Sequence, residues 1–334
     1  MNRQSVDVAL DSAADDLVIP FAIEGLEVRG RIVRLGHELD VLLKRHAYPE
    51  PVSALLAEAV TLTVLLGASL KFDGRFILQT QSDGPVDMMV VDYETPGQIR
   101  ACARIAPDRR DEIGARRDGN LAKLLGRGTL AMTIDQGPHM SRYQGVVPLE
   151  GESLEAAARL YFQQSEQIPT EVRLAVAETY KAGGGQATTG WRSGGIMIQH
   201  LPESGGDVRR DLPPGDVPDG VMIADVREDD HWSEARLLLE TVEDHELLDP
   251  DIAAGRLLYR LYHERAIRVF DAQPIAERCR CSRDKIETLI GQFSEEERAD
   301  MIQDDRIVVT CEFCSSVYEF PADVFDSKPE TGPA

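Results

Sequence analysis

The sequence predicts an α+β protein in three parts: a large N-terminal domain of sheet and helices, a helical linker region, and a small C-terminal domain built around cysteines. Segments that alternate apolar and polar residues, the period of a β-strand, recur through residues 24–201 and enclose one long apolar segment. Residues 203–220 are rich in glycine, proline and charge. Four of the five cysteines lie between Cys279 and Cys314.

The N-terminal domain is predicted to span residues 16–202, after a disordered tail at 1–15. Its expected strands share the two-residue period and lie at 24–35, 75–81, 86–93, 100–105, 129–135, 143–148, 171–179 and 194–201. Its expected helices lie at 38–46, at 51–70 and from a Ser153 cap to about 165. We therefore expect a sheet with helices packed on it, which is an α+β arrangement.

The most apolar segment, Val52 to Leu70, approaches the length of a membrane span. Glu58 lies inside it, and serine, threonine, alanine and glycine dilute its hydrophobicity. We interpret it as a buried core helix with one broad apolar face.

Residues 203–265 form the predicted linker region. After the exposed stretch at 203–220, helical spacing of apolar residues predicts amphipathic helices at 230–245 and 250–264. Little sequence is left to build a core of their own, so these helices need a neighbouring surface and would be marginally stable without it.

The chain has 58 acidic residues against 36 lysines and arginines, a net charge of −22. Such a surface repels phosphate backbones and anionic lipid, so nucleic acid and membranes are not expected as partners. The first residues contain no apolar signal-peptide region, so a cytoplasmic location is expected.

The cysteines form two short chelating arms, Cys279-Arg280-Cys281 and Cys311-Glu312-Phe313-Cys314, separated by a mostly helical segment at 282–303. This is a common way to build a tetrahedral thiolate site, and it predicts one zinc ion per chain held by Cys279, Cys281, Cys311 and Cys314. The predicted zinc-binding domain spans 266–325, followed by a disordered tail at 326–334. Because so small a unit has little core, metal binding should supply much of its folding free energy, of order 10 kcal/mol or more.

From spacing alone the site has three readings: a purely structural zinc ribbon, a redox-active centre, or a chance spacing of cysteines. Arg278, Arg280 and Arg283 surround the first arm, and cations favour thiolate over thiol. Both pairs are close enough in sequence to form local disulfides, which would leave zinc without ligands. Loss of zinc would unfold the small unit and remove support from the helices before it, which describes a redox switch.

The remaining reactive residue types suggest no further chemistry. Cys102 lies in an alternating stretch and is expected to be a buried structural thiol. The seven histidines show no ligand spacing, although His263 is the nearest of them in sequence to the cysteines. Gly183-Gly184-Gly185 is interpreted as a flexible turn, and Ser294 with the acids after it as a helix N-terminus. We find no nucleophile, base and orienting residue in combination, so the chain is not predicted to be an enzyme.

Several motifs resemble one family, the redox-regulated heat-shock chaperones called the thirty-three-kilodalton chaperonin family. The cysteine arms carry the resemblance as CRCSRDKIE and CEFCSSVYEF. Stretches along the rest of the chain carry it in order: YPEPV at 48–52, LKFDG at 70–74, QSDGPV at 81–86, RYQGVVPLEG at 142–151, YFQQSEQIPT at 161–170 and LYRLYHE at 258–264. The N-terminal tail and the stretch at 203–220 look longer than in the family.

The resemblance implies a cytosolic holdase chaperone without ATPase activity. It implies that the reduced, zinc-bound chain is inactive. It further implies that peroxide or hypochlorite, with mild unfolding, forms disulfides Cys279–Cys281 and Cys311–Cys314. Zinc then leaves, the C-terminal unit and linker helices unfold, and apolar surface is exposed to unfolded client proteins. Active members of the family tend to form homodimers, and the resemblance implies that residues 16–202 bind clients and dimerise. The helices at 230–264 and the apolar faces they cover are our candidate for the client-binding surface.

Two other functions compete with this one. A structural zinc ribbon in a nucleic-acid-binding protein is opposed by the net charge of −22 and by the lack of a basic, aromatic stripe. A thiol oxidoreductase using Cys311 and Cys314 would need a thioredoxin-like βαβ context, which the strand-like residues before Cys311 do not supply.

Overall fold

The computed structural model describes residues 14–70, 73–115, 121–137, 140, 142–183, 186–201 and 230–325. Within these residues the chain forms two six-stranded sheets and one three-stranded sheet. Sheet A is antiparallel, in the order β10 (Ile267–Val269), β1 (Leu17–Ile23), β2 (Val28–Leu35), β9 (Gln186–His200) and β8 (Thr170–Gly183), with β11 (Gln273–Pro274) also paired to β1. Sheet B has the order β12 (Ala276–Glu277), β5 (Gln98–Ile105), β4 (Val86–Glu94), β3 (Arg75–Ser82), β6 (Arg127–Asp135) and β7 (Tyr143–Glu150).

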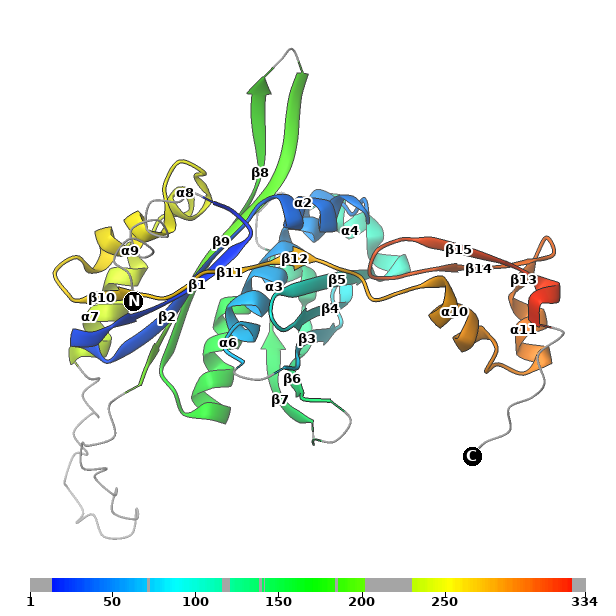
Figure 1. The fold of residues 1–334 in the computed structure, drawn as a ribbon, viewed down its shortest axis with the longest axis horizontal. Helices are drawn as coiled ribbons and strands as arrows, with labels where there is room; N and C mark the ends of the chain where they lie inside the picture. Colours follow the sequence, from blue (N-terminus) through cyan, green and yellow to red (C-terminus); the bar gives the residue numbers. More distant parts are fainter. Residues whose placement is uncertain are drawn as a thin grey trace, which may run out of the picture.

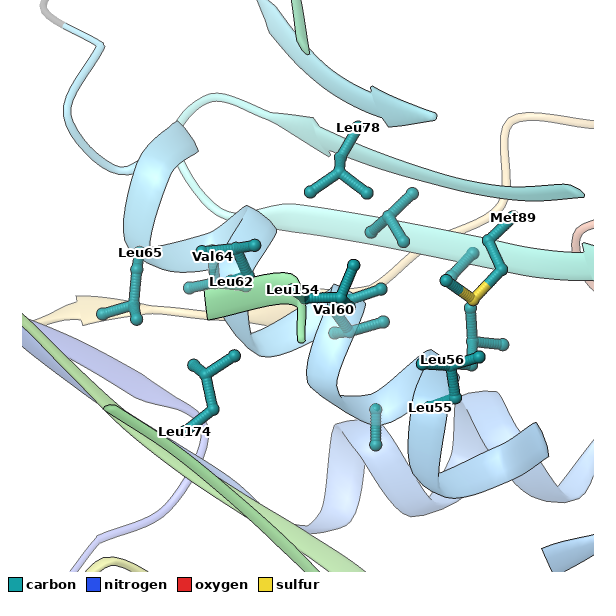
Figure 2. Close-up of a cluster of buried hydrophobic side chains, with 14 of the residues drawn as sticks. Leu55, Leu56, Val60, Leu62, Val64, Leu65, Leu78, Met89, Leu154 and Leu174 are labelled. Carbon is teal, nitrogen blue, oxygen red and sulfur yellow. The ribbon is translucent and has the colours of Figure 1, made fainter. Parts of the chain in front are cut away.

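The two large sheets enclose one helix, α3 (Glu50–Gly67), as Figure 1 shows. Leu174 of β8 lies on one side of α3, and Leu78 of β3 and Met89 of β4 lie on the other (Figure 2). Helices α2 (His37–Lys44) and α6 (Leu154–Tyr161) flank it, and Ser153 caps α6 by accepting a hydrogen bond from the Ala156 N–H at 3.3 Å. Short helical segments lie at η1 (Glu24–Leu26), η2 (Pro107–Arg109), α4 (Arg110–Ala115), α5 (Ala122–Leu125) and η3 (Phe162–Glu166).

Helix α3 was the candidate membrane span. Among the described residues it alone is long and apolar enough for one, yet 78% of it is buried inside the structure. It is apolar on all sides because both sheets pack against it, which is the pattern of a core helix. The interpretation as a buried core helix is therefore confirmed.

Glu58 is the one acid in the middle of α3, and burial raises its pKa to about 7, with Glu155 and Asp244 adding to the effect. Because this value lies above the ordinary 4.5, the folded chain favours the protonated carboxyl; the stability it supplies is complete below about pH 4.5 and is lost as the pH rises through about 7. We expect Glu58→Gln, which stays neutral, to raise the free energy of unfolding by roughly 1–2 kcal/mol at pH 8 and by much less at pH 5.

Denaturant unfolding at the two pH values measures this difference. Glu150→Gln, at the exposed end of β7, is the control and should show no pH-dependent gain. An equal effect of Glu58→Gln at both pH values would contradict the assignment.

The outer face of sheet A carries a second core. Helices α7 (Asp230–Glu240), α8 (Asp244–Leu248) and α9 (Ala254–Tyr262) pack there. Apolar residues of these helices and of the sheet bury one another: Ile19, Phe21, Ile32, Ile196, Ile198, Trp232, Ala235, Leu239, Leu257, Leu258 and Tyr262. Arg34 of β2, only 3% exposed, donates to the carbonyl oxygens of Glu246 at 2.6 Å and Asp249 at 3.0 Å, which fixes the end of α8. The linker helices thus have the neighbouring surface that their sequence requires.

Residues 267–277, which we call the connector, run along the edges of both large sheets (Figure 1). The connector pairs with β1 through β10 and β11 and then with β5 through β12, the last in parallel. It carries the chain from the linker helices to the cysteines. The predicted division into domains stays a proposal; this pairing places the connector with the N-terminal sheets, although the predicted boundary assigned it to the zinc-binding domain.

The C-terminal unit lies at one end of the long axis of the molecule (Figure 1). It contains α10 (Arg283–Ile290), α11 (Glu295–Met301), η4 (Ala322–Phe325) and sheet C, in the order β13 (Ile302–Gln303), β14 (Arg306–Thr310) and β15 (Val317–Pro321). As predicted, Ser294 begins a helix, in a capping box with Glu297. The buried apolar core of this unit, within the described residues, is Ile290, Ile307, Phe320 and Phe325. A core of this size contributes little stability, which agrees with a fold that depends on a metal.

The α+β class is confirmed, and four details of the prediction are wrong. The helix expected at 230–245 is two helices, because α7 ends at Glu240 and α8 begins at Asp244. The expected single sheet is two sheets, one on each side of α3. The strand expected at 24–35 begins at Val28, because Glu24–Leu26 form a turn and Glu27 has a left-handed φ of 52°. No strand was predicted at β1, which contains Pro20, a residue that is rare inside strands. The predicted loop at 203–220 lies outside the described residues.

Candidate metal centre

The two cysteine arms lie at the ends of well-defined elements. Cys279 and Cys281 follow β12, and Ser282 then caps α10 by accepting a hydrogen bond from the Lys285 N–H at 3.3 Å. Cys311 follows β14 and begins a tight turn to β15, which is closed by the Ser315 N–H donating to the Cys311 carbonyl at 2.8 Å. Ser315 has a left-handed φ of 56° in this turn. A capped helix and a hairpin turn therefore aim the two arms at each other.

The four predicted ligands come together. The sulfur atoms of Cys279, Cys281, Cys311 and Cys314 all lie within 4.8 Å of one another. The Sγ atoms of Cys279 and Cys311 are 3.7 Å apart, and those of Cys281 and Cys314 are 3.4 Å apart. A tetrahedral thiolate site with metal–sulfur bonds of about 2.3 Å has sulfur–sulfur edges of about 3.8 Å. The donor set and its spacing therefore fit one metal ion of the zinc type.

Hydrogen bonds make the four sulfurs unequal. Burial works against ionisation of Cys314, but hydrogen bonds involving the hydroxyl and backbone of Ser316 lower its pKa below the ordinary value for a thiol. Burial raises the pKa of Cys281 and Cys311. Four neighbouring thiols cannot all ionise without a compensating charge, and a divalent cation supplies that charge.

Tyr318 of β15 supports the first arm from across the site. Its hydroxyl lies 3.1 Å from the Sγ of Cys281, and this hydrogen bond is the main reason that the pKa of Tyr318 is raised to about 12. The Oγ of Ser316 lies within hydrogen-bond distance of the Sγ of Cys314, at 3.2 Å. Groups that hydrogen-bond to ligand sulfurs orient them and tune the metal. The sequence analysis missed both residues; the signal was a hydroxyl-bearing side chain close after the second arm.

The expected role of the arginines is supported only in part. Arg280 is committed to carboxylates of sheet B, with ion pairs to Asp92 at 2.6 Å and Glu94 at 3.3 Å. Arg283 donates to the Glu319 carbonyl at 2.8 Å and lies over the Phe320 ring. Because these guanidinium groups are already paired, they do less to favour thiolate than their sequence positions suggested.

Two observations bear on access and on the competing functions. A surface cavity of 410 Å³ is lined by both cysteines of the first arm and by Glu94, Arg278 and Lys285, so a small oxidant can reach these sulfurs. The second arm lies between the antiparallel strands β14 and β15. A thioredoxin-like site lies at the start of a helix after a parallel strand, so this geometry disfavours the oxidoreductase reading.

Cys102 lies apart from the cluster, as predicted. It is 4% exposed on β5, and burial raises its pKa to about 12. His263 has no role at the site and hydrogen-bonds to the Arg260 carbonyl beside it. His46 does lie against the second arm, with its Nε2 3.1 Å from the Phe313 carbonyl oxygen. Sequence spacing could not reveal this contact, because the two residues are far apart along the chain.

Known proteins resemble this chain along most of its length. The family model described as Hsp33 protein matches residues 16–321. A "33 kDa chaperonin" of Caulobacter vibrioides is 46% identical over 319 residues, covering 94% of this chain and 97% of the relative. One from Aeromonas salmonicida is 35% identical, covering 91% and 92%. The solved structure of the 33 kDa chaperonin (heat shock protein 33 homolog) of Thermotoga maritima has a TM-score of 0.71 at 19% identity, covers 93% of this chain and 97% of its own, and shows the same fold.

Proposed function

Because the chain belongs to the Hsp33 family of chaperones, we propose that it is a redox-regulated, ATP-independent holdase that keeps unfolded proteins from aggregating. The observation that carries this proposal is the cluster of four sulfurs within 4.8 Å, at the end of a connector that runs along the edges of both large sheets. In the reduced chain these sulfurs hold one zinc ion, and the chain is inactive.

Zinc is the metal that four thiolates in a tetrahedron select most commonly in structural sites. When bound, it would supply the charge that lets Cys279, Cys281, Cys311 and Cys314 ionise together. The C-terminal unit depends on it because the four buried apolar residues of its core cannot hold the fold alone.

Peroxide is the proposed oxidant. Formation of each disulfide removes two electrons from a pair of thiolates. One hydrogen peroxide molecule accepts these electrons and, with two protons, becomes two water molecules. The pairs are Cys279–Cys281 and Cys311–Cys314. The shortest sulfur contacts run between the arms, at 3.7 and 3.4 Å, so the static geometry does not select these pairs. Once ligands are lost and the unit loosens, closing the short loop within each arm costs the least entropy.

The signal reaches the rest of the chain through the connector. Residues 267–277 lie between the cysteines and helices α7–α9, so unfolding of the C-terminal unit frees one end of this paired segment. If α7–α9 then leave sheet A, the apolar face made by Ile19, Phe21, Ile32, Ile196 and Ile198 becomes exposed. A patch of this kind binds the apolar segments of unfolded proteins. We propose this face as the client surface, homodimers as the oxidised form and the cytoplasm as the location.

End-point assays test this function. A heat-unfolding client protein is followed by light scattering with the reduced chain, with the peroxide-treated chain, and with Cys102→Ser as the matched cysteine control. We expect suppression only after oxidation, the same behaviour in Cys102→Ser, and disulfides within each arm by peptide mass spectrometry. Equal suppression by the reduced and oxidised chains would contradict the switch.

The competing functions give different results in the same samples. Reduction of insulin disulfides without suppression of aggregation would favour a thiol oxidoreductase. A mobility shift of nucleic acid at low salt would favour a structural zinc ribbon. The net charge of −22 opposes the second of these.

A further inference from the structure

The first cysteine arm contacts the core through the residue that its cysteines enclose. Arg280, between Cys279 and Cys281, forms an ion pair of 2.6 Å with Asp92 of β4, whose side chain is only 6% exposed. A second contact of 3.3 Å joins Arg280 to Glu94. A partly buried, charge-assisted pair of this kind is stronger than an exposed one.

The second arm contacts the core in the same way. Phe313, between Cys311 and Cys314, packs its ring under Arg100 of β5, with 3.9 Å from the guanidinium carbon to the ring centre. The Phe313 carbonyl accepts a hydrogen bond from His46 Nε2 at 3.1 Å, and Ser315 Oγ lies 3.2 Å from His46 Nδ1. Since a carbonyl only accepts, His46 carries its proton on Nε2 and Nδ1 accepts from Ser315.

The core side of both contacts is one connected group. Arg100 donates to the same Asp92 carboxylate at 2.8 and 2.6 Å, so the partner of the first arm is bonded to the partner of the second. His46 is held by a parallel stack on Tyr48, with ring centres 4.8 Å apart, and the Tyr48 hydroxyl donates to the Ala103 carbonyl at 2.7 Å. The core therefore presents a preformed surface to both arms.

Disulfide closure constrains the backbone of the residues that make these contacts. In the reduced chain the sulfur contacts of 3.7 and 3.4 Å join one arm to the other. A disulfide within an arm has a sulfur–sulfur bond of about 2.05 Å and a fixed dihedral angle. The two sulfurs of an arm therefore turn away from the opposite arm towards each other. The ring that they close contains the backbone of Arg280 in the first arm and of Phe313 in the second.

We propose that Arg280 and Phe313 form a clasp with Asp92, Arg100 and His46 that holds the C-terminal unit against sheet B, and that closing either cysteine pair opens the clasp. This proposal rests on the proposed function, because peroxide drives the closure. It adds a direct route from the sulfurs to the core, since docking is lost in the same event that removes the metal ligands.

The clasp protects the junction of the connector with β5. There the Ala276 N–H donates to the Gly97 carbonyl at 2.9 Å, and the Arg278 N–H donates to the Ile99 carbonyl at 2.9 Å.

Arg280→Ala and His46→Ala, studied in the full reduced chain loaded with zinc, should leave metal content and the visible spectrum of the cobalt-substituted site unchanged. Amide hydrogen exchange at Ala276 and Arg278 should become about tenfold faster in each variant.

Arg278→Ala is the matched control, because Arg278 is exposed and lies just outside the first arm. It should leave the exchange rate of the Ala276 amide unchanged; the amide of residue 278 is not compared in this variant, because the substitution alters its intrinsic exchange rate. Unchanged exchange in both clasp variants would overturn the proposal, and so would loss of zinc from either of them, because the arms hold the metal without the clasp. These readouts need no client. Failure of the oxidised wild-type chain to suppress aggregation would instead reject the proposed function.

Discussion

Cys281→Ser should deprive the reduced chain of its metal ion and of the fold of its C-terminal unit. A serine hydroxyl is a poor ligand for a cation that thiolates bind, so three sulfurs remain where the tetrahedral site has four. Metal binding supplies about 10 kcal/mol or more to a unit of this kind, and the Ile290, Ile307, Phe320 and Phe325 core cannot replace it.

Metal analysis should find about one zinc per wild-type chain and close to none in Cys281→Ser. Amide hydrogen exchange should show protected β14 and β15 only in the wild type. Under reducing conditions the variant should also suppress aggregation without peroxide. Cys102→Ser, which removes a buried thiol outside the cluster, should keep its zinc. A zinc-free Cys281→Ser chain with a fully protected C-terminal unit would contradict the structural role of the metal.

Ala235→Glu should activate the chain without touching the metal. Ala235 of α7 has no exposed surface and packs in the core between the linker helices and sheet A, where the Tyr262 hydroxyl donates to its carbonyl at 3.1 Å. A carboxylate placed there has no partner, and the cost of burying it, about 3 kcal/mol or more, exceeds what a marginal helix gains by docking. We expect the reduced, zinc-loaded variant to bind a hydrophobic dye and to suppress aggregation.

Leu237→Glu is the control, because Leu237 lies on the same helix and is 55% exposed. It introduces the same charge on the solvent side and should leave the reduced chain inactive. If Ala235→Glu exposes apolar surface but binds no client, sheet A is not the client surface. If Ala235→Glu also loses zinc, then undocking of the linker helices destabilises the zinc site at the other end of the connector, which is a tighter coupling than we propose.

The periodicity of the sequence predicted the elements better than their arrangement. Strands β3 and β4 were placed within a residue or so, because a turn rich in glycine and proline separates two alternating stretches. The burial of α3 followed from its composition. Neither signal reveals that α3 lies between two sheets or that the connector pairs with β1 and β5, because those pairings join residues far apart in sequence.

At the site, the cysteines could be identified from sequence because metal ligands occur as closely spaced pairs. Tyr318 and Ser316 could not, since a hydroxyl near a cysteine is common and only the hairpin β14–β15 brings these two to the sulfurs. His46 was one of seven histidines without ligand spacing, so its sequence neighbours indicated no role at the site. Its contact with Phe313 depends on docking of two separate parts of the chain.

The most direct test of the redox switch follows zinc release and suppression of client aggregation in the same sample. The reduced, zinc-loaded chain is treated with peroxide at a mildly unfolding temperature, while a chromogenic chelator reports released zinc and light scattering reports aggregation of a client. We expect one zinc to leave per chain and suppression of aggregation to rise over the same time course. Suppression that is complete before any zinc is released, or zinc that stays bound to an active chain, would contradict the redox switch.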